Sequence, residues 1–102
     1  MTEEIKGKVR QMLGVYEIDA EEFARLDLHI DGAFDFFVNI KGIAETVITS
    51  ISGLQLITIY VNDVWREQGE FKFSPATEIL FNSLMDATAG LNYADSFVSG
   101  YN

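Results

Sequence analysis

The chain has 102 residues, of which 16 are acidic and 7 basic, so its formal net charge at neutral pH is −9. A surface of this sign repels nucleic acid and anionic membranes and favours basic partners. Apolar residues make up 48% of the chain and cysteine is absent. This indicates a single folded domain over residues 1–102, and it excludes disulfides, thiol catalysis and cysteine-based zinc sites.

The N-terminal residues do not have the pattern of an export signal. The stretch Met1–Glu4 is acidic and lacks the basic and then apolar layout of a signal peptide. The longest apolar-rich run, Leu54–Val61, is far shorter than the ~20 residues that a membrane-spanning helix needs. We therefore expect a soluble, cytoplasmic protein that does not associate with membranes.

Two helices are predicted to begin in the first part of the chain. Thr2 is a suitable N-cap for a helix over residues 3–14, which carries an apolar stripe at helical spacing. Asp19 can accept a hydrogen bond from the Glu22 amide while the Glu22 side chain reaches back, which is a variant of the capping box. A second helix is therefore expected to start at this point.

The pattern leaves open how far this second helix continues. The apolar residues of 26–30 have both the spacing of a helix that continues from Phe23 and the alternation of a strand. The stretch 34–40 alternates as a strand. If 26–30 is also a strand, a three-residue loop at 31–33 gives a hairpin with every apolar side chain on one face.

The middle of the chain is predicted to supply further strands. Residues 46–52 are rich in β-branched side chains, and residues 54–66 begin with a run that is apolar on both faces, as in a central strand. A three-residue turn at 67–69 ends in glycine, which favours a hairpin loop. That register pairs Arg66 with Glu70 across the hairpin.

The C-terminal part is predicted to be helical. Ser74 and Pro75 are a favourable cap and first residue of a helix, Gly90 is expected to end it, and Asn92 can begin a short last helix. With helices at both ends of about four antiparallel strands, the sequence predicts an α+β domain.

One segment has the chemistry of a metal site. On a strand, Asp27, His29 and Asp31 would share a face, and Asp35 would lie opposite His29, so that these side chains could hold a divalent ion. An ordinary solvent-facing strand gives the same alternation, and on a helix the side chains diverge. A metal-dependent or acid–base site at His29 is therefore the least favoured hypothesis.

The sequence motifs of common enzyme classes are missing. Neither a nucleophile elbow of the GxSxG type nor a glycine-rich phosphate loop occurs in the chain. We therefore predict a protein that is not an enzyme and that needs no cofactor.

The C-terminal aromatic residues Tyr93, Phe97 and Tyr101 recur every four residues. On a helix they would form one stripe, which either packs on the core or contacts a second subunit in a homo-oligomer.

The acidic residues are unevenly placed. Between positions 17 and 35 Arg25 is the only base, and the acids there are Glu17, Asp19, Glu21, Glu22, Asp27, Asp31 and Asp35. Acidity of this size can simply keep a protein soluble. A concentrated acidic face can also dock on a protein with a basic surface, such as a nucleic-acid-binding protein.

The sequence therefore predicts a small acidic interaction module. The favoured class is an inhibitor, immunity or anti-defence protein that blocks a basic surface of its target. The alternative is a self-associating structural or accessory subunit that uses the C-terminal aromatic stripe.

Overall fold

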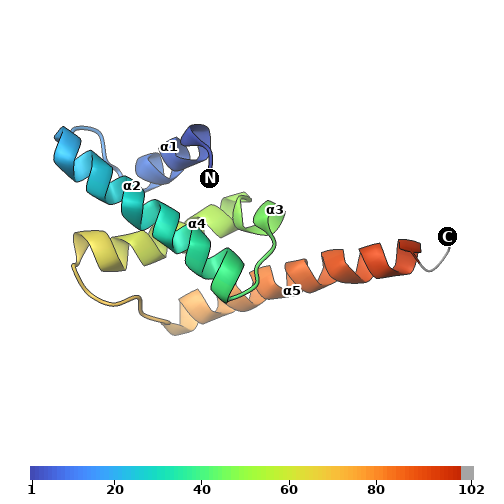
Figure 1. The fold of residues 1–102 in the computed structure, drawn as a ribbon. Helices are drawn as coiled ribbons and strands as arrows, with labels where there is room; N and C mark the ends of the chain where they lie inside the picture. The colour runs from blue at the N-terminus through green and yellow to red at the C-terminus, as the bar shows by residue number, and fades with distance from the viewer. Residues whose placement is uncertain (100–102) are drawn as a thin grey trace.

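The computed structural model describes the backbone of residues 1–99 and the side chains of residues 1–91. Every regular element in this part of the chain is a helix (Figure 1). In chain order they are α1 (Glu3–Met12), α2 (Ala20–Asp35), η1 (Phe36–Ile40), α3 (Glu45–Ile48), α4 (Ile51–Val61), η2 (Asn62–Arg66) and α5 (Pro75–Ser99). The π-helical turns η1 and η2 directly continue α2 and α4. None of the described helices combines the length and apolarity needed to cross a membrane.

The predicted α+β fold with an antiparallel sheet is wrong, since residues 1–99 contain no strand. The segment whose state the sequence left open belongs to the continuous helix α2–η1. Leu26, Ile30, Ala33 and Phe37 follow helical spacing along it and are all fully buried. The side chains of residues 34–40, whose alternation indicated a strand, are therefore spread around a helix.

Helix α4 occupies the place that was predicted for a central strand. Leu54, Leu56, Ile57 and Val61 are buried, and α4 contacts each of α1, α2, α3 and α5. A segment that is apolar on all sides suits a helix enclosed by other helices as well as a strand covered on both faces. The stretch 46–52, also predicted to be a strand, forms α3 and the start of α4.

The predicted hairpin at residues 67–69 is the end of a helix. The Gly69 amide donates to the Asp63 carbonyl at 2.9 Å and so closes η2. Arg66 donates a hydrogen bond to the Leu13 carbonyl at 2.7 Å. Glu70, its predicted hairpin partner, is not bound to it in the described contacts. The bond to Leu13 ties the end of η2 to the end of α1.

The predicted starts of three helices are confirmed. The Thr2 hydroxyl accepts from the Ile5 amide at 3.3 Å, the Asp19 carboxylate from the Glu22 amide at 2.8 Å, and the Ser74 hydroxyl from the Thr77 amide at 3.2 Å. The predicted end of the last helix is wrong, because α5 continues through Gly90 to Ser99.

Aromatic packing fixes the segment between η2 and α5. The Phe71 ring centroid lies 5.0 Å from that of Tyr60 on α4 and 5.6 Å from that of Phe37 on η1. Phe73 packs in turn on Phe81 of α5, with centroids 5.4 Å apart. The irregular segment therefore joins α4 and α5 through side chains and not through backbone pairing.

Candidate partner-binding surface

The seven acidic residues predicted to bind a partner all lie on α2 or in the loop before it. Glu17 is in the loop, Asp19 caps α2, and Glu21 and Glu22 are in its first turn. The others are spaced by four along the helix, at Asp27, Asp31 and Asp35, and therefore follow one side of it. The structure thus divides the acidic block into two groups with different surroundings.

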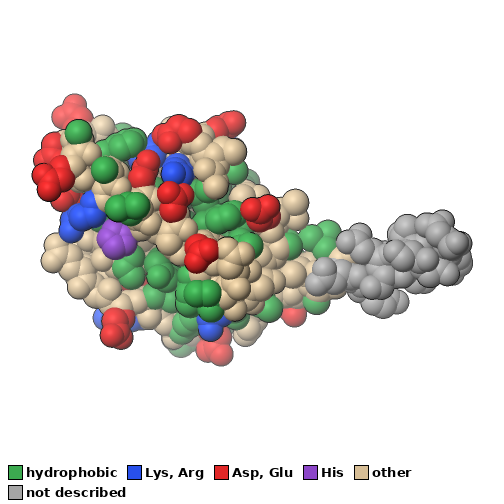
Figure 2. All heavy atoms as spheres, viewed as in Figure 1, with side chains coloured by type: hydrophobic (Ala, Val, Ile, Leu, Met, Phe, Trp, Pro, Cys, Tyr) green, Lys and Arg blue, Asp and Glu red, His purple; other side chains and the backbone are tan. Residues whose placement is uncertain are grey.

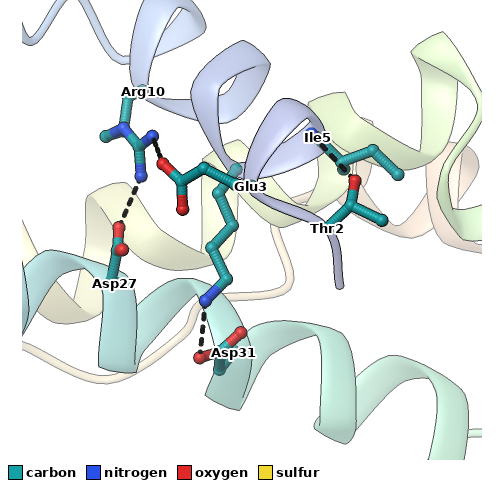
Figure 3. A network of polar contacts seen from close by, with 7 residues as sticks. Thr2, Glu3, Ile5, Arg10, Asp27 and Asp31 are labelled. Carbon is teal, nitrogen blue, oxygen red and sulfur yellow. Dashed lines mark hydrogen bonds and ion pairs between the residues drawn. The ribbon is translucent and has the colours of Figure 1, made fainter.

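The first two members of the α2 stripe bind basic side chains of α1. Lys6 Nζ lies 3.0 Å from Asp31 Oδ2, and Arg10 Nη1 lies 2.7 Å from Asp27 Oδ1 (Figure 3). The two bases are four residues apart, as are the two acids, and their order is reversed. The pairs therefore connect α1 and α2 as antiparallel neighbours.

Arg10 is the centre of this polar network. Its guanidinium group binds Glu3 of its own helix as well as Asp27, and it lies 4.5 Å above the Phe23 ring. Burial by itself lowers the pKa of Arg10, but the hydrogen bonds and charges of Glu3 and Asp27 outweigh it, so the pKa lies above its usual value. The group therefore stays charged at all ordinary pH values.

These contacts give Asp27 and Asp31 a structural role that the sequence did not show. Asp35, the third acid of the stripe, accepts a hydrogen bond from the Asn39 side chain at 2.6 Å. Among the described ion pairs, four of the seven acids take no part, namely Glu17, Asp19, Glu21 and Asp35, and the first three of these lie before or within the first turn of α2.

The predicted metal site at His29 is not assembled by the structure. Because α2 is helical, His29 is turned away from Asp27 and Asp31, which face α1. Among the described residues, no group of three or more acidic or histidine side chains could hold an ion.

We define the acidic tip as Tyr16, Glu17, Asp19, Glu21 and Glu22. Tyr16 has 85% of its surface exposed, and Glu22 binds Arg25 at 3.0 Å. Figure 2 shows acidic side chains gathered at the end of the molecule where α1 and α2 lie, with hydrophobic side chains between them. The tip therefore combines negative charge with an exposed aromatic ring.

Tyr16 is the residue of this surface that the sequence reasoning missed. It lies between Gly14, which ends α1 with a left-handed φ of 73°, and the cap of α2. The sequence feature that could have identified Tyr16 is its place as an aromatic residue in a short loop, outside any apolar stripe.

The structure does not describe the side chains of the residues predicted for self-association. Tyr93 and Phe97 belong to the backbone of α5, but their side chains are outside the described ones, and Tyr101 is outside the described residues altogether. That part of the interpretation stays a prediction.

Comparisons of the chain with protein-family models, with curated proteins and with solved structures find no match. The functional argument therefore depends on the surface itself.

Proposed function

We propose that this protein is a non-catalytic interaction module that docks through its acidic tip on a basic surface of another protein. The observation that carries the proposal is the position of Tyr16, exposed by 85% and surrounded in the sequence by carboxylates that are mostly free of basic partners. Among the ion pairs of the described residues, only Glu22 of the tip takes part, with Arg25.

The two components of the tip have different tasks in such a complex. Carboxylates attract a basic partner over a distance and raise the rate of encounter, and they disfavour acidic competitors. Tyrosine supplies a large, rigid contact area that loses little conformational freedom on binding, which is why it is frequent at the centres of interfaces. The combination supports docking better than acidity alone, which would only improve solubility.

Within this proposal the favoured class is an inhibitor, immunity or anti-defence protein. A protein of this class needs a rigid charged face and no reactive group. Its target would be a protein with a basic surface, for example one that binds nucleic acid, because spaced carboxylates imitate the charge of phosphates. A cytoplasmic location belongs to the same proposal.

The test uses a fluorescent peptide rich in arginine and lysine as the probe, titrated by anisotropy at low and at physiological salt. The double variant Glu17→Lys/Glu21→Lys reverses charge at the tip and leaves the Asp19 cap intact. The control, Glu78→Lys/Asp86→Lys, makes the same change of net charge at exposed positions on α5.

We expect the tip variant to weaken binding by about tenfold or more and the control to weaken it far less, with both effects smaller at higher salt. Equal losses in both variants would show that only net charge matters, and the proposal would then be wrong. Tyr16→Ala in the full chain should also weaken binding at the higher salt concentration, where the aromatic contact contributes a larger share.

A further inference from the structure

A groove runs between α5 and the segment that contains α3. Its volume is about 430 Å³, and the described side chains that line it are Thr46, Val47, Ser50, Ser52, Ser83, Leu84, Ala87 and Leu91. All of them are uncharged, and most are short. In a chain with a net charge of −9, this is an unusual stretch of surface.

The helix that forms one wall of the groove extends well beyond the body of the protein. Figure 1 shows the last turns of α5 projecting away from the other helices, and within residues 1–99 no other element runs beside them. The molecule measures 54 × 29 × 20 Å, and its radius of gyration of 15.2 Å exceeds the ~13 Å expected for a compact chain of this length.

The described contacts between α5 and the body of the protein lie in the first part of the helix. Leu84 is buried, and the Thr88 hydroxyl accepts a hydrogen bond from the Ala44 amide at 3.0 Å. Leu91, the last residue whose side chain is described, is 44% exposed. A helical stretch as short as the rest of α5 is only marginally stable in water without tertiary packing.

We infer that the groove binds the projecting part of α5 from a second copy of the chain, so that the protein is a two-fold symmetric dimer. The groove and the projecting helix belong to the same element, which makes the surface self-complementary. Residues 83–91 border the groove and residues 91–99 project. A two-fold axis that crosses α5 near Leu91 places residues 83–91 of each copy opposite residues 91–99 of the other copy.

The low charge of both surfaces favours a second copy as the occupant. The groove lining carries no charge, and the projecting stretch 91–99 carries one carboxylate, Asp95, so two acidic chains repel each other little where these surfaces meet. Ser83, Ala87 and Leu91 are spaced by four and share one side of α5, whereas Glu78 and Asp86 lie on another side together with Asn82. A basic partner, by contrast, would find nothing to pair with in this groove.

The arrangement also separates the acidic tips. The tip lies at the end of the molecule opposite to the C-terminal end of α5 (Figure 1). Pairing through α5 therefore places the two tips at the far ends of the dimer, where their repulsion is weak. The inference does not depend on the proposed function, because it concerns a different surface.

Sedimentation velocity of the full chain over a range of concentrations tests the dimer. Ala87→Glu places a carboxylate in each copy of the groove, and Asn82→Glu introduces the same charge on the same helix but on the acidic side. Both positions are exposed, so both variants should fold, which circular dichroism checks. We expect the wild type and Asn82→Glu to dimerise and Ala87→Glu to dimerise at least about tenfold more weakly.

A monomeric wild type at all concentrations, or equal behaviour of the two variants, would overturn the inference. A second measurement uses the absence of cysteine from the natural chain. Leu91→Cys lies near the proposed axis and should form a disulfide-linked dimer under mild oxidation, because a disulfide needs Cα atoms within about 7 Å. Asn82→Cys should not, and equally fast cross-linking of both variants would show random collision.

Discussion

Arg10 and Asp27 join the first two helices through a hydrogen-bonded ion pair that is largely shielded from water. The donor Nη1 and the acceptor Oδ1 are 2.7 Å apart, and the side chains are only 13% and 19% exposed. One turn further along, Lys6 binds Asp31, whose side chain is 47% exposed. The two bases are similarly buried, at 13% and 16% exposed, but Asp31 is much more exposed to solvent than Asp27.

We predict that Asp27→Asn destabilises the protein by about 2 kcal/mol, because a partly buried guanidinium loses its charged acceptor. The contribution should be present throughout the neutral pH range. The raised pKa of Arg10 means that this stabilisation is fully present below the pKa of the unfolded chain and is lost only as pH rises through the still higher folded value, in strongly alkaline solution. Urea unfolding at neutral pH measures the change.

Asp31→Asn is the matched control, since it removes the same charge one turn away on the same helix. Its loss should be no more than about 0.5 kcal/mol, because solvent screens the half-exposed carboxylate of Asp31. Equal losses for Asp27→Asn and Asp31→Asn would contradict the role given to burial.

Gly53 is the residue on which the approach of α3 to α4 depends. A Cβ atom added to it would overlap the backbone carbonyl group of Ile48, which cannot move without displacing α3. We predict that Gly53→Ala destabilises the protein by about 3 kcal/mol or more. Thermal unfolding followed by circular dichroism gives the comparison with the wild type.

Gly32 provides the opposite case within a helix. It is exposed in α2, and a Cβ atom there would meet nothing within 4 Å. Gly32→Ala should therefore stabilise the protein by about 0.5–1 kcal/mol, as alanine does in helix interiors. A gain at both glycines would show that the close contact at Ile48 relaxes without cost.

The sequence was sufficient to predict where α1, α2 and α5 begin, because capping is local. Asp19 needs only the amide of Glu22, three residues away, and the structure contains that bond. It was not sufficient to distinguish helix from strand in the apolar stretches. The run that contains Leu56 and Ile57 is buried on all sides, and the periodicity of such a run does not identify its secondary structure.

Only part of the candidate site could be predicted, because its contacts depend on how distant segments pack. The sequence located the acidic residues on and before α2, but it could not show that Asp27 and Asp31 face bases from α1. That fact depends on the antiparallel packing of two helices, which is a long-range property. The capping pattern is local, in contrast, and it correctly gave Asp19 a structural role at the start of α2.

The ends of η1 and η2 have the same hydrogen-bonding pattern but different residues in the left-handed position. The Ile43 amide donates to the Phe37 carbonyl at 2.9 Å across Gly42, whose φ is 81°, and the end of η2 is closed in the same way across Gln68, whose φ is 53°. A side chain in this conformation costs about 1 kcal/mol or more. We predict that Gln68→Gly stabilises the protein by about 0.5–1 kcal/mol.

Gly42→Ala is the converse change and should destabilise by about 1 kcal/mol, since no neighbouring atom lies within 4 Å and only the backbone conformation opposes it. Urea unfolding of both variants measures the two shifts. Shifts of the same sign would show that these helix ends are not equivalent.

Phe71 determines whether the segment between η2 and α5 stays attached to the body. Its ring packs on Tyr60, Phe36 and Phe37 and is partly buried against the core. We predict that Phe71→Ala destabilises the protein by about 2–3 kcal/mol, less than the ~3–5 kcal/mol of a fully buried aromatic side chain because the site is only partly enclosed. Amide hydrogen exchange should show faster exchange in residues 67–74 than in α4.

Phe73→Ala is the control for this prediction. Phe73 is 43% exposed and packs on Phe71 and Phe81 at the surface of the same cluster. Its removal should cost about 1 kcal/mol, because less apolar area returns to water. If Phe73→Ala proves as costly as Phe71→Ala, the segment is held by the whole aromatic row and not by insertion of Phe71 between α4 and η1.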